Sequence, residues 1–197
     1  MTTLARTPRP LQVLLIAGFI SLAACSKSDD SPASAGGASA TPAAASVNED
    51  LANVGEYQLT MAKFDKYLAA QKNIGLKAKS LSPAERQAME ARQEGRDNSN
   101  ASLEEMAKNI EAEPVFEAAI RDVGLSPREF AVLTMSIMQS AMAAGVAKMR
   151  PNDNQDSLIR EMKASPANVK FFRDNEAELT RKQKELEAEM KRLGLDT

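Results

Sequence analysis

Apolar residues recur along the chain at intervals of three and four positions, the spacing that places side chains on one face of an α-helix. Three such stripes are Tyr57, Met61, Phe64 and Leu68; Leu103, Met106 and Ile110; and Phe116, Ile120 and Val123. No convincing run of apolar residues alternates with a period of two, so the pattern predicts no strand. The fold class that follows is all-α.

Helix starts are marked by serine residues that have glutamate three positions later, the arrangement of a capping box. Such boxes begin at Ser82, Ser102 and Ser126, and proline follows the first and the third at the first helical position. Ser165, which also precedes a proline, predicts one more helix start. Glycines stand at four places where the pattern predicts that helices end: Gly75, Gly95, Gly124 and Gly194.

These signals divide the chain into three parts. Residues 50–197 are long enough for one domain with a core, and we predict a helical bundle of about five to seven helices that ends in a long charged helix over 166–193. Residues 26–49 consist mainly of Ser, Ala, Gly, Pro and Thr, a composition that predicts a disordered linker. Residues 1–25 differ from both.

Residues 1–25 have the regions of an export signal: arginines without acidic residues, an apolar run, and small residues before Cys25. The apolar run is shorter than the roughly 20 residues that a membrane span needs. The residues Leu22-Ala23-Ala24-Cys25 resemble the lipobox of bacterial lipoproteins, and this resemblance implies that Cys25 is acylated and becomes the mature N-terminus. The alternative is an ordinary secretory signal with an incidental cysteine.

Lipid on Cys25 would anchor the chain, because two or more acyl chains hold a protein stably at a membrane. Ser26 follows the cysteine where Asp would favour retention at the inner membrane, so the resemblance to Gram-negative lipoproteins implies the outer membrane, facing the periplasm. The expected partners are the membrane, through Cys25, and a protein of unknown identity.

The amino-acid composition excludes several kinds of catalytic and metal-binding site. The 197 residues include 25 Lys and Arg, 27 Asp and Glu, one Cys, no His and no Trp. Without His there is no Ser-His or Cys-His nucleophile and no imidazole metal site, and one Cys cannot form an internal disulfide. A formal net charge of −2 argues against a nucleic-acid partner. We therefore expect no catalytic residue, no metal and no cofactor.

The segment from Pro127 to about Met149 is the most apolar part of the predicted domain, and it has no charge between Phe130 and Ala147. Its methionines follow one another at intervals of three, four and seven: Met135, Met138, Met142 and Met149. One interpretation is a core helix whose methionines fill gaps beside small residues. The others are a binding surface for apolar ligands or unfolded chains, because thioethers adapt to varied surfaces; capture of copper(I); and a membrane span diluted by polar residues.

The predicted last helix is polar nearly all round beyond Phe172, and it carries Phe172, Leu179, Leu186 and Leu193 seven positions apart. One Leu per heptad, without an apolar d position, is too few for a coiled-coil seam. Two interpretations stay open, a solvated helix with one edge docked on the bundle and a protruding helix that binds a partner.

Carboxylates are the remaining catalytic candidates, because a muramidase needs a glutamate in an apolar cleft. No glutamate is followed directly by serine, as in many lytic transglycosylases, and we expect polar helix surfaces or caps to hold Glu104, Glu105, Glu111 and Glu113. The Asp- and Asn-rich runs 97–100 and 152–156 lack the spacing of an EF-hand loop and are interpreted as turns and caps.

Short motifs in the body suggest a family likeness. They are Leu59-Thr60-Met61, Ile110-Glu111-Ala112-Glu113-Pro114, Gly124-Leu125-Ser126-Pro127, Met138-Gln139-Ser140-Ala141 and Pro166-Ala167-Asn168-Val169. With them the body looks similar to uncharacterised small envelope proteins of Gram-negative bacteria, which implies a location and a helical fold and no activity. A weaker likeness is to Spy-type periplasmic chaperones, whose Leu-Thr-x-x-Gln signature is matched only in part by Leu59-Thr60-Met61-Ala62-Lys63.

The sequence thus predicts a lipid-anchored, non-enzymatic envelope protein that serves as an interaction or structural module. The alternative is a periplasmic chaperone or carrier that binds apolar ligands through its methionine-rich helix.

Overall fold

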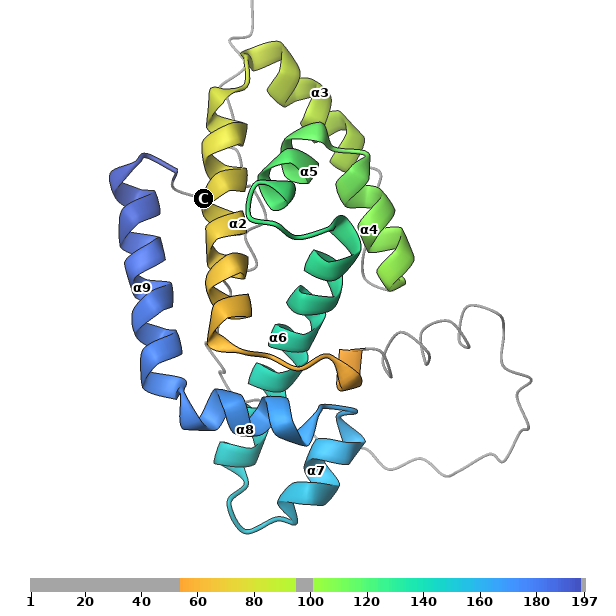
Figure 1. The fold of residues 1–197 in the computed structure, drawn as a ribbon, viewed down its shortest axis with the longest axis vertical. Helices are drawn as coiled ribbons and strands as arrows, with labels where there is room; N and C mark the ends of the chain where they lie inside the picture. Colours follow the sequence, from red (N-terminus) through yellow and green to blue (C-terminus); the bar gives the residue numbers. More distant parts are fainter. Residues whose placement is uncertain (1–53, 95–100, 196–197) are drawn as a thin grey trace, which may run out of the picture. The chain divides into compact units, whose positions relative to one another are not determined.

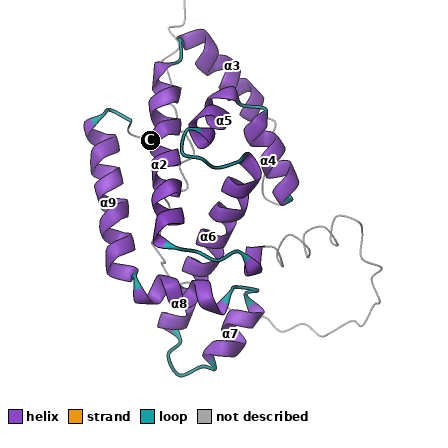
Figure 2. Ribbon diagram, viewed as in Figure 1, coloured by secondary structure: helices purple, strands orange, loops and turns teal. Residues whose placement is uncertain are grey.

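The computed structural model describes residues 54–94 and 101–195 (Figure 1). The predicted signal peptide, Cys25 and the linker lie outside these residues, as does Gly95. After a helical turn at residues 54–56, the described part forms eight helices: α2 (Met61–Ser80), α3 (Pro83–Gln93), α4 (Leu103–Glu111), α5 (Pro114–Arg121), α6 (Pro127–Met149), α7 (Gln155–Glu161), α8 (Pro166–Asp174) and α9 (Glu176–Arg192). No strand occurs among the described residues, so the all-α prediction is confirmed (Figure 2).

The predicted capping residues begin their helices. Ser82 and Ser102 each accept a hydrogen bond from the backbone N–H of the glutamate three positions on, whose carboxylate accepts one from the serine N–H in return. Ser126 accepts from the N–H of Glu129 in the same way. Each bond satisfies a helix-terminal N–H that has no partner within the helix, so these positions fix where α3, α4 and α6 start.

The predicted helix over 166–193 is two helices, and this break brings the number to eight instead of the predicted five to seven. Asn175 ends α8 and begins α9 with a backbone conformation outside the helical range (φ −111°, ψ 12°), and its side-chain amide donates a hydrogen bond to the carbonyl of Phe171 at 2.8 Å. Figure 1 shows α9 leaving α8 at a sharp angle and running beside α2.

Helix α2 begins later and ends later than the apolar pattern predicts. Tyr57 precedes the helix, because the side chain of Thr60 caps it and Met61 is its first residue. Gly75 was predicted to end a helix, yet it lies inside α2. A Cβ atom at Gly75 would stand 3.3 Å from Cδ1 of Leu195, which is tighter than nine in ten real Cβ contacts. Gly75 therefore allows the segment after α9 to approach α2 closely.

Two other glycines do end helices as predicted. Gly124 and Gly194 have positive φ angles of 71° and 63°. This left-handed conformation is open to glycine at little cost, and it lets the chain turn back after α5 and α9 while the last carbonyls of those helices keep partners.

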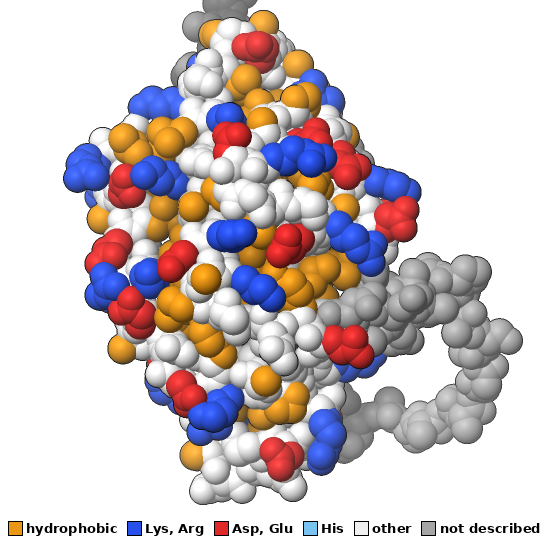
Figure 3. Space-filling model, viewed as in Figure 1, with side chains coloured by type: hydrophobic (Ala, Val, Ile, Leu, Met, Phe, Trp, Pro, Cys, Tyr) orange, Lys and Arg blue, Asp and Glu red, His pale blue; other side chains and the backbone are white. Residues whose placement is uncertain are grey.

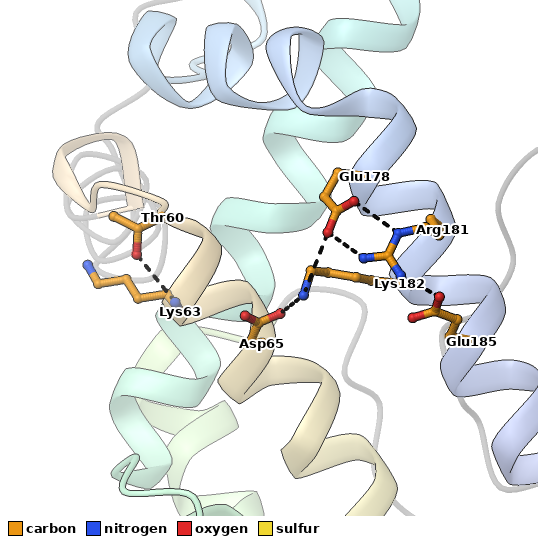
Figure 4. Close-up of polar contacts among 7 residues, drawn as sticks. All are labelled: Thr60, Lys63, Asp65, Glu178, Arg181, Lys182 and Glu185. Atoms are coloured by element: carbon orange, nitrogen blue, oxygen red, sulfur yellow. Dashed lines mark hydrogen bonds and ion pairs between the residues drawn. The ribbon is translucent and has the colours of Figure 1, made fainter.

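Helices α2 and α9 run parallel, joined by ion pairs seven residues apart on both helices. The Nζ of Lys182 lies 2.8 Å from a carboxylate oxygen of Asp65 (Figure 4). The Nζ of Lys72 lies 2.8 Å from a carboxylate oxygen of Glu189. Helix α2 supplies the acidic side chain of the first pair and the basic side chain of the second. If α9 shifted by one heptad along α2, side chains of like charge would therefore face each other. One edge of α9 is therefore docked on the bundle, and acidic and basic side chains alternate along its outer side (Figure 3).

Helix α6 contributes to all three clusters of buried apolar residues. In the largest, Leu133 and Ile137 pack with residues of α2, α5 and α9; Ala131 belongs to a second cluster with Val54, and Ala143 to a third. The largest cluster consists of Leu59, Phe64, Tyr67, Ala70, Ile120, Leu125, Leu133, Ile137 and Leu179. Helix α6 is thus the one element that all three clusters share.

Candidate interaction surface

The termini of α6 are set by local sequence. Ser126 caps the N-terminus and Pro127 occupies the first position, where its missing N–H is not needed. At the other end Arg150 leaves the helical conformation (φ −121°, ψ 62°) because the following proline disfavours it in the preceding residue. The 23 residues between these points form one unbroken helix.

The side of α6 that faces its neighbours is lined largely by small residues. Ser136 and Ser140 are buried along with four apolar residues of the same side: Leu133, Ile137, Ala143 and Ala147. The hydroxyl of Ser136 donates a hydrogen bond to the carbonyl of Val54 at 3.2 Å. Small side chains let helix backbones approach closely. Helix α6 lies against α4, α7 and α8, and its Leu133 and Ile137 meet residues of α2, α5 and α9.

The outward side of α6 carries three methionines. The exposed fractions of Met138, Met142 and Met149 are 41%, 55% and 59%. The helix repeat places these three side chains within an arc of roughly 40° and along about 16 Å of the helix axis. We call them the Met face. Three of the four exposed large apolar side chains of the described residues belong to it; the fourth is Leu76 on α2.

The fourth predicted member of the stripe, Met135, does not share this exposure. It is partly buried and packs against the cluster of Val54, Leu103 and Ala131. The structure therefore brings three of the four predicted methionines together on an open surface and places the fourth at its packed edge.

The surface between the methionines is uncharged and open. A Cβ atom built on Gly145, which lies between Met142 and Met149 on the same side, would meet no atom within 4 Å. The nearest charge along the helix, Lys148, forms an ion pair with Glu176 at 2.7 Å and so is directed toward the start of α9. Gly145 is the residue that sequence reasoning missed here, and its spacing of three and four from the methionines would have placed it on their side.

By length and composition, α6 is the one helix among the described residues that could cross a membrane. The core helix of a protein that never enters a membrane passes the same test, and 44% of the most apolar part of α6 is buried by other parts of the chain. The long apolar run is thus divided between a packed side and the Met face.

The four carboxylates predicted to lie on polar surfaces or caps do so. Glu104, Glu105 and Glu111 are exposed, and Glu113 is the N-cap residue of α5. The side chain of Glu113 is only 1% exposed, a burial that the sequence did not predict. The guanidinium of Arg92 on α3 donates hydrogen bonds to both carboxylate oxygens of Glu113, the shortest at 2.9 Å. These bonds raise the pKa of Arg92. The buried carboxylate of Glu113 is thus paired with a guanidinium on another helix.

Other candidate sites have simple structural roles or lie outside the described residues. The run 97–100 is outside them. Asn154, in the run 152–156, caps α7 by accepting a hydrogen bond from the N–H of Ser157 at 3.0 Å. Across the parts of the chain that the structure describes, no three His, Cys, Asp or Glu side chains gather where they could hold a metal ion.

Tyr57 lies beside the start of α6 and is the titratable group whose environment is best defined. Its hydroxyl donates a hydrogen bond to Oε1 of Glu129 at 3.4 Å, and the Nζ of Lys63 lies 3.8 Å from the centre of its ring. Partial burial, followed by the charge of Glu129 and the hydrogen bond to it, raises the pKa of Tyr57 to about 12. Burial also raises the pKa of Tyr67.

We expect ultraviolet titration of the folded protein to show no tyrosine ionising with the ordinary pKa of about 10. The folded state holds the Tyr57 proton more tightly than the unfolded chain, so its contribution to stability is complete below pH 10 and is lost as the pH rises toward 12. Glu129→Gln should lower the pKa of Tyr57, whereas Glu117→Gln, on the surface of α5, should not change it. A tyrosine that ionises near pH 10 in the folded protein would contradict this environment.

Comparison with known proteins identifies no relative: no family model, no curated protein and no solved structure matches the chain.

Proposed function

We propose that this protein is a lipid-anchored, non-enzymatic protein of the bacterial cell envelope whose helical body binds another protein through the Met face of α6. The observation that carries the proposal is the concentration of exposed large apolar side chains on one side of one helix. Monomeric proteins rarely expose large contiguous apolar patches, and those that they do expose often mark interaction sites.

The chemistry of the Met face restricts the partner. A charged partner segment would lose water against an uncharged surface and gain no opposite charge, which is costly. An apolar helix or strand loses little by the same contact, and the flexible thioethers of Met138 and Met142 can adapt to its shape. We therefore infer that the partner presents an uncharged, apolar segment. A carrier of small apolar ligands needs a concave site instead, and the Met face is the side of a single helix.

The location rests on the lipobox. Cys25→Ser should abolish acylation and move the protein from the membrane fraction to the soluble fraction of lysed cells, because the described domain would then have no lipid anchor. The matched control is Ser26→Ala, which leaves the acceptor cysteine in place and should stay in the membrane fraction. Membrane retention of the Cys25→Ser variant would contradict a lipid anchor at this residue.

The binding surface is tested by a polar and an apolar version of the Met face in the full chain. The triple change Met138→Gln, Met142→Gln and Met149→Gln should reduce the partner captured from crosslinked cells about tenfold or more, a loss of at least ~1.4 kcal/mol. The same three positions changed to Leu should retain capture, because Leu keeps the apolar surface. Both variants should unfold at the wild-type temperature, since the three side chains are exposed.

Two outcomes would redirect the proposal. Equal capture by the Gln and Leu variants would remove the Met face from the interaction and leave the charged outer side of α9 as the candidate. Capture of many unrelated unfolded chains, all lost in the Gln variant, would favour the chaperone alternative.

A further inference from the structure

We propose that the Met face is a site of reversible oxidation, at which peroxide or hypochlorous acid converts Met138, Met142 and Met149 to sulfoxides while the fold stays intact. Oxidation would also remove the apolar surface and so prevent partner binding, and this consequence rests on the proposed function. The selectivity of the oxidation does not rest on it and follows from accessibility alone.

The methionines of the described residues fall into three groups by burial. Met138, Met142 and Met149 are exposed. Partly buried residues form the second group: Met61, Met106, Met135 and Met162. Met89 and Met190 are buried. Oxidation of a buried thioether requires local opening of the structure, whereas an exposed one reacts directly, so the three groups should differ in rate.

All three exposed methionines lie on the same side of α6, so their oxidation changes one surface. The open position at Gly145, where a Cβ atom would meet nothing within 4 Å, leaves room beside Met142 and Met149 for an oxidant to approach. The fold should tolerate the change because the packed side of α6 consists of other residues, among them Leu133 and Ile137.

The chemistry is a two-electron transfer of one oxygen atom. The sulfur lone pair attacks an oxygen of hydrogen peroxide, the O–O bond breaks, an S=O bond forms, and the remaining oxygen leaves as water after proton transfer. With hypochlorous acid the oxygen is delivered in the same net sense and chlorine leaves as chloride with a proton. The product is a polar sulfoxide, which methionine sulfoxide reductases return to the thioether with electrons from thiols.

The first test is a time course of hydrogen peroxide treatment of the full-length protein under native conditions, followed by peptide mass spectrometry. Met138, Met142 and Met149 should oxidise at least about tenfold faster than Met89 and Met190, with no change in helical circular dichroism. Equal rates at the exposed and buried groups would overturn the proposal, as would loss of helical signal when the first sulfoxides form.

The second test measures the apolar surface with a probe that does not depend on a partner. The wild-type protein should be retained on a phenyl-substituted resin more strongly than the variant with Gln at positions 138, 142 and 149, which carries the same lipid on Cys25. This difference should disappear after oxidation and return after treatment with methionine sulfoxide reductases. The variant with Leu at positions 138, 142 and 149 should be retained before and after oxidation. Unchanged retention of the oxidised wild-type protein would overturn the conclusion that oxidation removes the apolar surface.

Partner capture separates this proposal from the proposed function. Loss of capture on oxidation, with recovery after reduction and no loss in the Leu variant, would support both. Failure of the untreated protein to capture any partner would overturn the proposed function, whereas the mass spectrometry and resin retention decide the oxidation site by themselves. If selective oxidation left partner capture unchanged, the conclusion that oxidation of the Met face prevents binding would be overturned.

Discussion

Replacing Phe64 by alanine should lower the free energy of unfolding by about 3–5 kcal/mol. Phe64 has no exposed surface and lies in the largest apolar cluster, where α2, α5, α6 and α9 meet. Its ring packs near that of Tyr67, with the ring centres 6.3 Å apart. Truncation removes the apolar contacts of the ring and leaves a cavity that the surrounding helices can fill only in part.

Chemical denaturation followed by circular dichroism measures this loss, and Leu76→Ala is the matched control. Leu76 lies on the same helix and is 38% exposed, so its truncation should cost about 1–2 kcal/mol, well below the loss at Phe64. Similar losses in the two variants would contradict the position of Phe64 at the centre of the core.

The second large effect is expected at Asn168. Its side-chain oxygen accepts a hydrogen bond from the N–H of Leu59 at 2.8 Å, and its amide donates one to the carbonyl of Tyr57 at 2.7 Å. One buried side chain on α8 therefore satisfies two backbone groups of the segment that leads into α2. Asn168→Ala should cost about 2–4 kcal/mol, because it leaves a donor and an acceptor without these partners in a buried place.

The matched control for Asn168 is Gln155→Ala. The amide of Gln155 also donates to a backbone carbonyl, that of Arg150 at 2.8 Å, but in an exposed setting where water can replace it. This control should change stability by less than about 0.5 kcal/mol. If Asn168→Ala were equally mild, the pairing between α8 and residues 57–59 would be wrong.

The sequence predicted the helix starts well because they depend on neighbouring residues. Ser82, Ser102 and Ser126 each cap a helix with their own hydroxyl, so three or four residues contain the whole signal. The all-α class followed from the same local patterns. The number of helices did not, because the break at Asn175 coincides with docking of α9 on α2, a contact between distant parts of the chain.

Gly75 and Glu113 show where local signals fail. Glycine ends a helix at Gly124, where φ is positive, whereas Gly75 lies inside a helix and permits close packing. The role of Gly75 depends on its contact with Leu195, which is distant in sequence. Burial of Glu113 depends on Arg92, which lies 21 positions earlier on another helix. No pattern around either residue indicates a partner so far away in sequence.

The orientation of α6 could not be predicted because both of its sides are free of charge. Hydropathy favours burying methionine over serine, yet Ser136 and Ser140 are buried and Met142 is exposed. Close approach of neighbouring helices requires small side chains, and the hydrogen bond from Ser136 to Val54 satisfies a hydroxyl that would otherwise be costly to bury. Only the structure shows which methionines of the candidate site are exposed to solvent.

The most direct test of the central claim is photocrosslinking in living cells from position 142 of the full-length chain, compared with position 184 on the outer side of α9. We expect a specific protein adduct from position 142, with the crosslink mapped to an uncharged apolar segment of the partner, and no such adduct from position 184. A protein adduct from position 184 alone, or only lipid adducts from position 142, would contradict a protein-binding Met face.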